Sequence, residues 1–581
     1  MAFLVHAGLG SSGIDPRRLV SSAGGHTVTW FSAEDQTRGG AVCLSPLASI
    51  ARLELGDHLD CLIVGRIRLD RRQELRTSLG RDQAGDRLLL SDADLCLQAY
   101  AKWGAGFVEH LHGDFAFVIY DNVARELIGV RDRCGVRILA WCQSGTSCWV
   151  SGSMQDLVSA SSSNYRQIDP SWISDFLQTG TSTDPSRSVY ADVRRLSPAH
   201  IMSVSGKGLS IRRYWRLEVD GPQNFKSPDE VTEAFHSHLN AAMLDRLPSD
   251  RVGLMMSGGL DSPTLVAKTL ELAGAELEVF VSTWLSGDQR DPEAEASQQV
   301  SDYLGLRRTI VDADQLQFDP RLPANPATNV EPNLAAMAPP TLQQEALARS
   351  QQAKVWLYGE GPDNALTFEW RMHFNWISRR QQWGHLPKAI ASYLATKSLV
   401  DWKTTFSSRF TNDRADQARR YPELTWIKGT GSPGQDAPAC DWRPAAHRNL
   451  TSGLWPAFFE RLDVKDAPFG VDWRHPYMDL RMLEFMLSTP PIPWARHKLL
   501  IRHAMKGRLP LETLRRKKTP VHRDVFENLL RQHLPPLPQR GSAVEPFVNI
   551  DRLPKHPSTY GDMHALARLV IVDRWLQSRR A

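Results

Sequence analysis

The segment Arg251–Lys268 constrains the fold more than any other. It reads RVGLMMSGGLDSPTLVAK, so a short apolar run ends in Ser-Gly-Gly-Leu-Asp-Ser and a helix-like pattern follows at once. Strand-like and helix-like runs then alternate: LEVFVST, PEAEASQQVSDYLG, RTIVD, TLQQEALARSQQ and KVWLYGEG. Strands alternating with helices predict a parallel sheet covered on both faces. The later part of the chain is therefore predicted to be an α/β domain.

The first part of the chain has a different sequence pattern. Short β-rich runs such as LDCLIVGRIRLD and DFAFVIYD are separated by turn residues at fairly regular spacing. That pattern is typical of sheet packed on sheet, here with some helical cover. The segment VDGPQNFKSPDE has the Gly, Pro and charge content of a linker. We therefore predict a multidomain α/β protein with one domain over residues 1–216 and a second over 217–581.

Composition excludes several classes. A net charge of +4 over 581 residues gives no reason to expect a nucleic-acid partner. No stretch approaches the roughly 20 apolar residues of a membrane span, and the N-terminus does not read as a signal peptide. A cytoplasmic protein is therefore expected. Cys142 and Cys148 are close enough in sequence for a hairpin disulfide, but two thiols are the favoured interpretation.

The Ser-Gly-Gly-Leu-Asp-Ser turn has the features of an anion site. Ligands of open parallel sheets bind beyond the carboxyl ends of strands, where this turn lies. Gly258 and Gly259 allow close backbone approach, Ser257 and Ser262 add hydroxyl donors, and helical N–H groups follow. Asp261 would repel a phosphate unless it binds Mg²⁺. The alternative is a tight turn with an ordinary Asp at the helix start.

A second acidic turn follows another predicted strand. In VWLYGEGPDNAL, Glu360 and Asp363 come after the apolar run, and Gly359 and Gly361 permit close backbone approach. Two acids from two strand ends can share one magnesium ion. A plain surface turn is the alternative.

These residues resemble a known family. SGGLDS is similar to the pyrophosphate loop of ATP-pyrophosphatases, and GEGPDN to the second loop of the asparagine synthetase-like branch. DWRHPYMDLRMLEFMLSTPP and HKLLIRHAMKGRLPLETLRRKK continue the resemblance, and LHGDFAFVIYD with ELIGVRDRCGVRILAW resembles the glutaminase-type half. The resemblance implies an N-terminal glutaminase-like, Ntn-type β-sandwich with helices. A parallel-sheet synthetase domain of the ATP-pyrophosphatase, adenine nucleotide α-hydrolase-like type would follow it.

The resemblance also implies residue roles. A carboxylate would attack the α-phosphorus of ATP, giving an acyl-adenylate and pyrophosphate. Asp261 and Asp363 would hold Mg²⁺, and Lys518 would be the catalytic lysine. Lys498 and Arg502, four apart and so on one helix face, are weaker candidates that a solvated basic face explains equally well. The residues expected to bind ATP and pyrophosphate are Ser257, Gly258, Gly259, Leu260, Asp261, Ser262, Gly359 and Gly361.

The glutaminase half departs from the family pattern. Glutamine-dependent members carry Cys after the initiator Met, where this chain has Ala2, which offers no nucleophile. The Asn-Gly pair of the oxyanion hole is replaced by Val64 and Gly65, although Asp92 remains. Residues 1–216 are therefore predicted to be catalytically inactive, and the amine must come from elsewhere.

An amine on the same substrate is the simplest source, because intramolecular attack supplies a large effective molarity. A β-lactam, a carbapenam and a peptide macrolactam all fit. A lasso-peptide cyclase is favoured, with a precursor peptide as its partner and a leader peptidase left open. Glu360 departs from the Tyr of β-lactam synthetases and is nominated as the base. The basic-aromatic texture of FEWRMHFNWISRRQQW and TTFSSRFTNDRADQARRY suits a peptide, although core packing plus a solvated face explains it too.

Three alternatives remain open from the sequence. The chain could make a β-lactam or carbapenam from a small molecule, or be an ammonia-dependent asparagine-type amide synthetase. It could also be a non-catalytic binding protein of the same descent, against which the presence of Asp261, Asp363 and Lys518 argues. Pro362 and Asn364 replace common residues of the second loop, so family substrate contacts do not transfer there directly.

Overall fold

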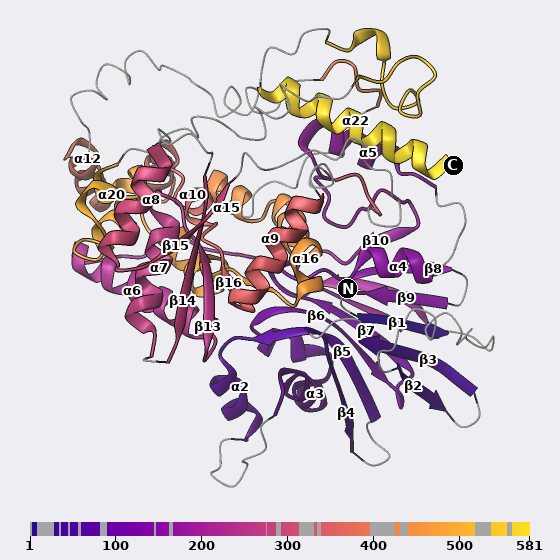
Figure 1. Cartoon of the computed structure of the whole chain (residues 1–581). Coiled ribbons are helices and arrows are strands. Elements are labelled where there is room, and N and C mark those ends of the chain that lie inside the picture. The colour runs from indigo at the N-terminus through magenta and orange to yellow at the C-terminus, as the bar shows by residue number, and fades with distance from the viewer. Residues whose placement is uncertain are drawn as a thin grey trace.

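The computed structural model describes residues 3–8, 28–33, 36–43, 47–55, 60–81, 90–144, 147–161, 167–274, 276–285, 292–312, 330–333, 339–395, 424–429, 440–516, 536–554 and 560–580. Within them lie two antiparallel sheets from the N-terminal part of the chain and one parallel sheet from the following part (Figure 1). The predicted multidomain α/β class is confirmed.

The two antiparallel sheets have six strands each, and they include nearly every β-rich run of the N-terminal sequence. The first has the order β10-β8-β9-β1-β3-β2 and the second β12-β11-β7-β6-β5-β4. Their strands are β1 (Phe3–Gly8), β2 (Val28–Ala33), β3 (Gln36–Cys43), β4 (Ser49–Glu54), β5 (Asp60–Leu69), β6 (Gly113–Asp121), β7 (Glu126–Arg131), β8 (Ala140–Ser144), β9 (Ser147–Ser151), β10 (Val193–Arg195), β11 (His200–Ser205) and β12 (Gly208–Arg213).

Alternation along β5 shows how these layers pack. Leu62 and Val64 share a core with residues of β1 and β9, so they face the other sheet. Cys61 and Ile63 point the opposite way and pack under the helix Asp92–Trp103, which is α3. Because side chains of a strand alternate between its two faces, one β-strand contributes to both cores. The expected sheet-on-sheet packing with helical cover is confirmed.

Short helices complete this part of the chain. They are α2 (Arg72–Leu79), α3 (Asp92–Trp103), η1 (Gly104–His110), α4 (Met154–Ala160) and α5 (Pro170–Thr179). Ser91 caps α3 in a capping box with Asp94, which explains why the helix begins at Asp92.

The parallel sheet has the strand order β15-β14-β13-β16-β17. Its strands are β13 (Arg251–Met255), β14 (Glu278–Leu285), β15 (Arg308–Asp312), β16 (Val355–Leu357) and β17 (Asp472–Arg474). From β13 the chain moves outward through β14 and β15, and then returns to the other side of β13 with β16 and β17. The order therefore reverses between β13 and β16, and such a switch point is where open α/β sheets bind ligands.

The described helices of this part of the chain lie mostly around the parallel sheet. They are α6 (Pro228–Leu244), α7 (Asp261–Leu272), α8 (Pro292–Tyr303), α9 (Pro339–Gln352), α10 (Pro362–Ala365), α11 (Trp370–Arg379), η4 (Trp383–His385), α12 (Leu386–Ala395), α15 (Pro444–Leu450), α16 (Leu454–Asp466), η5 (Ala467–Phe469), η6 (Pro476–Met478), α17 (Leu480–Ser488), α18 (Pro491–Trp494), η7 (Arg496–Lys498), α19 (Leu499–Ala504), α20 (Leu511–Arg515), η8 (Ile550–Arg552) and α22 (Tyr560–Arg580). Among the described helices, none combines the length and the apolar character needed to cross a membrane.

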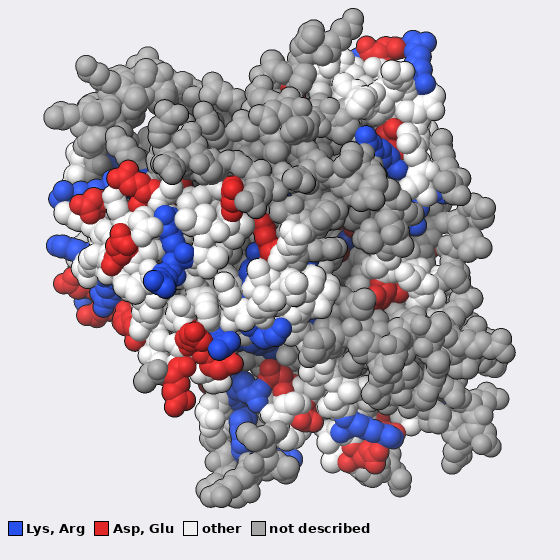
Figure 2. All heavy atoms as spheres, in the orientation of Figure 1, with Lys and Arg blue, Asp and Glu red and all other residues white. Residues whose placement is uncertain are grey.

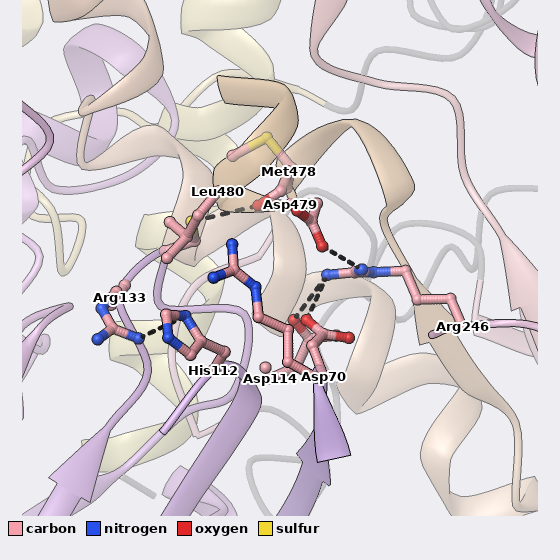
Figure 3. Close-up of a pocket in the computed structure, with 11 residues that line it drawn as sticks. Asp70, His112, Asp114, Arg133, Arg246, Met478, Asp479 and Leu480 are labelled. Carbon is pink, nitrogen blue, oxygen red and sulfur yellow. Dashed lines mark hydrogen bonds and ion pairs between the residues drawn. The ribbon is translucent and has the colours of Figure 1, made fainter. Parts of the chain in front are cut away.

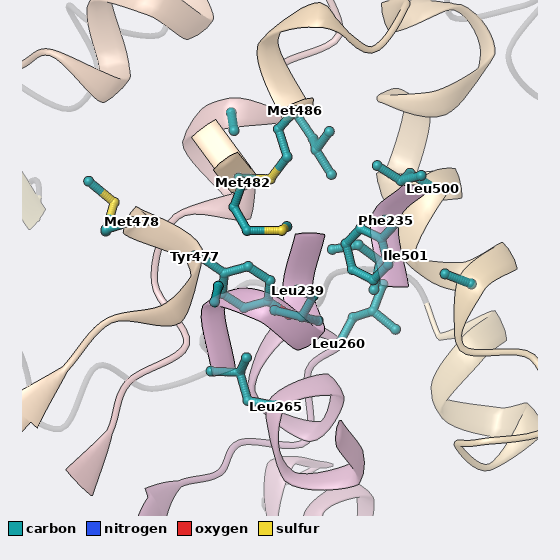
Figure 4. Close-up of a cluster of buried hydrophobic side chains, with 14 of the residues drawn as sticks. Phe235, Leu239, Leu260, Leu265, Tyr477, Met478, Met482, Met486, Leu500 and Ile501 are labelled. Atoms are coloured by element: carbon teal, nitrogen blue, oxygen red, sulfur yellow. The ribbon is translucent and has the colours of Figure 1, made fainter. Parts of the chain in front are cut away.

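One hydrophobic core fixes the start of α7. Phe235 and Leu239 of α6 pack with Leu260 and with Leu500 and Ile501 of α19 (Figure 4). Leu260 is only 8% exposed. Because Leu260 is packed in this core, the Ser-Gly-Gly-Leu-Asp-Ser turn is held at the end of β13.

The C-terminal helix returns to the N-terminal part of the chain. Leu566, Leu569 and Trp575 of α22 share a buried core with Trp172 and Phe176 of α5, and Figure 1 shows the two helices side by side. The linear division of the sequence did not predict this packing.

Buried ion pairs join the antiparallel and parallel parts of the chain. Arg66 of β5 donates to Asp463 of α16 at 2.8 Å, and Arg137 donates to Asp463 at 3.0 Å and to Asp472 of β17 at 2.5 Å. We call Arg66, Arg137, Arg474, Asp463 and Asp472 the interdomain network. On the surface, by contrast, acidic and basic side chains are interspersed on the face seen in Figure 2.

Candidate active site

The two predicted acidic turns come together at the switch point of the parallel sheet. The Ser-Gly-Gly-Leu-Asp-Ser turn follows β13, and the Gly-Glu-Gly-Pro-Asp turn follows β16, which pairs with β13. Gly359 lies so close to the start of α7 that a Cβ on it would be 3.1 Å from the Cα of Ser262. The second turn therefore needs a residue without a side chain at position 359.

The first turn is organised by its own hydroxyl groups. The Ser257 N–H donates to the Ser262 Oγ at 2.9 Å, the two serine hydroxyls are 2.9 Å apart, and the Gly259 N–H donates to the Ser257 Oγ at 3.2 Å. The two predicted hydroxyl donors thus face the same turn. They lie beside the N-terminus of α7, where backbone N–H groups and the helix dipole favour an anion.

Gly258 is needed for packing. A Cβ on it would be 2.5 Å from the Cβ of Ala296 in α8. Its N–H donates to the Glu293 carboxylate at 2.5 Å, and its carbonyl accepts from Arg516 at 3.1 Å. Arg516 and Glu293 also lie 3.6 Å apart. Sequence reasoning assigned this glycine to anion approach and missed both charged partners.

The second turn rests on Tyr477. Gly361 has a φ of 137°, which L side chains rarely adopt, and its Cβ would lie 2.9 Å from the Tyr477 Cβ. The Tyr477 hydroxyl donates to the backbone carbonyl of Asp261 at 3.1 Å. One buried tyrosine therefore holds both turns. Pro362 is the first residue of α10, a position where its missing N–H costs nothing.

Asp261 and Asp363 are brought together by a lysine. The Lys498 Nζ is 2.5 Å from the Asp261 Oδ2 and 2.6 Å from the Asp363 Oδ1. Burial disfavours the ammonium charge, but the two carboxylates outweigh it and raise the pKa of Lys498 above its ordinary value. The Asp261 side chain is 15% exposed and that of Asp363 40% exposed. These are the two carboxylates that could hold a metal ion.

The predicted arrangement of Lys498 and Arg502 on one helix face is wrong. Lys498 has a left-handed backbone, as has His497 before it, and α19 begins only at Leu499. Lys498 therefore turns toward the acids, while the Arg502 guanidinium donates to the backbone carbonyls of His497 and Arg516, at 2.6 and 2.8 Å, and to that of Leu514. Arg502 thus ties the Lys498 turn to the segment that leads to Lys518, which itself lies outside the described residues.

Glu360 occupies the middle of the second turn, between Gly359 and Gly361. It lies near Tyr358, whose pKa is raised to about 12 by burial and by the Glu360 charge. The role of Glu360 as a base stays a prediction. Of the nominated site residues, all but Lys518 fall within the described residues and belong to the two turns.

The segment that would form the oxyanion hole of a glutaminase is used for packing. Val64 is buried between the sheets, and a Cβ on Gly65 would lie 2.3 Å from that of Phe117. The next residue, Arg66, belongs to the interdomain network. Asp92 accepts from the Leu69 N–H at 3.0 Å and pairs with Arg72. Ala2 lies outside the described residues.

Three other acids, Asp70, Asp245 and Asp479, form a cluster beside the pocket of Figure 3. Arg246 donates to Asp70 at 3.0 Å and to Asp479 at 2.7 Å, and Arg481 donates to Asp245 at 2.5 Å. Guanidinium groups therefore already satisfy these carboxylates, which fits an ionic contact between the two parts of the chain better than a metal site.

Comparison with known proteins agrees with this architecture. The asparagine synthase family matches residues 234–577, and the glutamine amidotransferase domain family matches residues 71–215. Asparagine synthetase [glutamine-hydrolyzing] 3 of Bacillus subtilis is 31% identical over 34% of this chain. Amidase chry2 of Gibberella zeae is 22% identical over 69% of it, and amidase chyE of Penicillium rubens 24% over 72%.

The alignments cover different shares of these relatives. The chain spans 31% of the Bacillus protein and 66% and 70% of the two fungal ones. The asparagine synthase match, however, covers more than half of this chain and includes both acidic turns, Tyr477, Lys498 and the parallel sheet. The chain belongs to the asparagine synthase family.

Proposed function

We propose that this protein is an ATP-dependent, AMP-forming carbon–nitrogen ligase that closes a precursor peptide into a macrolactam, as a lasso-peptide cyclase does. The observation that carries the ligase assignment is the pairing of Asp261 and Asp363 through Lys498 at the switch point of the sheet. The lack of a nucleophile at Ala2 and of an Asn at Val64 supports an amine source other than glutamine.

The donor set fits magnesium. Carboxylate oxygens from two turns, with room left for phosphate oxygens and water, are what Mg²⁺ takes in phosphate-binding sites. A magnesium ion held by Asp261 and Asp363 would neutralise charge on the β- and γ-phosphates and on the leaving pyrophosphate. The Lys498 ammonium now neutralises the same carboxylates, so we expect it to turn toward phosphate oxygens when the metal and ATP bind.

The remaining residues orient the nucleotide. Ser257 and Ser262 offer hydroxyl groups, and the turn from Gly258 to Leu260 offers backbone N–H groups at the start of α7. For the Gly258 N–H to reach a phosphate, Glu293 has to move away, because its carboxylate accepts from that group. Lys518 is assigned as the fixed positive charge beside the reacting phosphate.

Two steps complete the reaction. A side-chain carboxylate oxygen of the peptide attacks the α-phosphorus, the bond to the β-phosphate oxygen breaks, and pyrophosphate leaves. The peptide's N-terminal amine then attacks the acyl carbon, AMP leaves, and the amine proton passes to Glu360. An α-amine has a pKa of about 7.7–8.0, so a weak base is sufficient. Holding both ends of one peptide together lowers the barrier by roughly 7 kcal/mol.

The test uses the full-length protein, ATP and magnesium. A pool of synthetic peptides with a free N-terminus and one internal Asp or Glu is compared with the same pool N-acetylated. The free pool should release pyrophosphate and AMP and yield products lighter by one water, whereas the acetylated pool can be adenylated but not cyclised. Pyrophosphate release with free aspartate or a carboxyethyl amino acid, and none with the peptides, would refute the macrolactam assignment in favour of a small-molecule synthetase.

A further inference from the structure

A groove separate from the two acidic turns lies between the linker and α11, α12 and α18. It is lined by residues 220–225 of the linker, by His373, Trp376 and Ile377 of α11, and by Pro490, Ile492, Pro493 and Trp494 at α18. Gln382, His385, Lys388, Ala389 and Ser392 complete its wall. Its volume is about 570 Å³, which is more than one side chain fills. We call it the α11–α12 groove.

Two side chains of this groove each carry a buried polar atom that lacks a hydrogen-bond partner among the described residues. The atoms are the Trp376 Nε1 and the His373 Nδ1, on side chains that are 7% and 6% exposed. They are three residues apart on α11 and so lie on neighbouring turns of one face. A buried polar group without a partner destabilises the folded protein. Such a cost is offset when a ligand supplies the partner.

The chemistry of the groove specifies an acceptor-rich, partly apolar ligand. An indole nitrogen is always a donor, and Lys388 at the groove also only donates. Burial first, and then the charge of Arg443, lower the pKa of His373 to about 4, so its imidazole is neutral at pH 7. The facing wall is apolar, formed by Pro490, Ile492, Pro493 and Trp494. An extended peptide offers carbonyl acceptors together with apolar side chains.

Both walls of the groove lead to the acidic turns. The α18 wall ends at Trp494, four residues before Lys498, and α11 begins shortly after α10, which carries Asp363. Between groove and turns, the Arg496 guanidinium lies 5.7 Å from the ring of Phe368, which links the two connecting segments. A ligand in the groove would therefore press on the segments that position Lys498 and Asp363.

We propose that the α11–α12 groove binds a segment of the peptide substrate away from its reacting carboxylate, with the Trp376 N–H donating to a backbone carbonyl. This inference rests on the proposed peptide substrate. The structure describes the first of the two basic-aromatic segments, residues 368–383. Its Trp376 lines the groove, and its Trp370 packs on Tyr393 of α12. The other segment, residues 404–421, lies outside the described residues.

The test measures peptide binding separately from catalysis. The full-length protein is immobilised without ATP and exposed to the peptide pool with free N-termini, and the retained peptides are quantified by mass spectrometry. Trp376→Phe removes the N–H but keeps an aromatic ring, and it should weaken retention about two- to tenfold. Trp383→Phe is the matched control, because Trp383 is 55% exposed and does not line the groove.

A second variant covers the case in which Trp376→Phe does not fold. Ser392→Trp adds bulk at the groove wall and leaves Trp376 and His373 in place, so it should abolish retention. Retention by both variants equal to wild type, or no retention by wild type, would overturn the groove assignment. Pyrophosphate assays on the same proteins separate the two proposals. If the Trp376→Phe protein binds peptide as the wild type does and still releases pyrophosphate in a peptide-dependent manner, the groove proposal is refuted and the proposed function is not.

Discussion

Replacing Asp463 should weaken the contact between the antiparallel and parallel parts of the chain more than replacing its partner Arg66. The interdomain network contains three arginines and two aspartates, and the side chains of Arg66, Arg137 and Asp463 are each less than 10% exposed. Asp463→Ala leaves Arg66, Arg137 and Arg474 with one carboxylate, that of Asp472. Removing one partner of a buried ion pair costs about 3–5 kcal/mol.

Arg66→Met is the decisive comparison. It leaves two arginines with two aspartates, so we expect a smaller loss of stability than for Asp463→Ala. Although burial disfavours its charge, Asp472 keeps a pKa well below its usual range, because Arg137, Arg474 and Arg66 outweigh that effect. Charge balance, and not the number of hydrogen bonds removed, is therefore expected to determine the order of the two variants.

The assay is urea unfolding followed by tryptophan fluorescence, with the first transition compared among variants. Arg540→Ala serves as the control, since the Arg540–Asp551 pair is exposed on both sides and should show no measurable change. An Asp463→Ala protein within about 1 kcal/mol of wild type would refute the reasoning. An Arg66→Met protein less stable than Asp463→Ala would refute it too.

Three further predictions concern the site and its support. Lys498→Met should lower the rate of AMP formation by about 10²–10³-fold in a steady-state pyrophosphate assay. Gly361→Ala should cost about 1–3 kcal/mol of stability through strain and contact with Tyr477, visible as a lower melting temperature, whereas the open position Gly206 should tolerate alanine. Burial lowers the pKa of His475 to about 4. The unfolded chain therefore binds more protons between about pH 6.5 and pH 4, so stability should fall by about 1.4 kcal/mol per pH unit as pH falls through that window. His475→Gln should flatten that slope in pH-dependent melting curves.

The acidic turns were predictable because topology alone brings them together. Alternating strands and helices imply a parallel sheet, and the carboxyl ends of parallel strands share one edge, so Asp261 and Asp363 were expected at the same edge. The structure adds that their strands, β13 and β16, are direct neighbours. Serine and glycine at such an edge are typical of an anion-binding turn.

The central role of Lys498 could not be read from the sequence. A basic residue followed by an apolar helix pattern predicts a helical lysine, but the left-handed backbone at positions 497 and 498 turns this side chain to the acids. Tertiary contacts decide such a turn, because a left-handed backbone is uncommon for residues other than glycine. Glu293 and Arg516 were missed for a related reason: their partner is the backbone of Gly258, which carries no sequence signal.

Long-range packing was equally hidden. Arg66 and Asp463 are 397 positions apart, and α22 returns to pack on α5. No pattern within a window of sequence reports such pairs. The glutaminase-like half could be predicted to lack a nucleophile, but its second use, as a partner held by buried ion pairs, emerges only from the structure.

Product analysis with the purified full-length protein tests the central claim most directly. Incubated with ATP, magnesium, glutamine and the peptide pool, it should form AMP and pyrophosphate in a peptide-dependent manner, and Asp261→Asn should abolish this while remaining folded. Glutamate should not accumulate, since nitrogen is taken from the peptide's own amine. Formation of ADP, or glutamine hydrolysis coupled to nucleotide cleavage, would contradict the account.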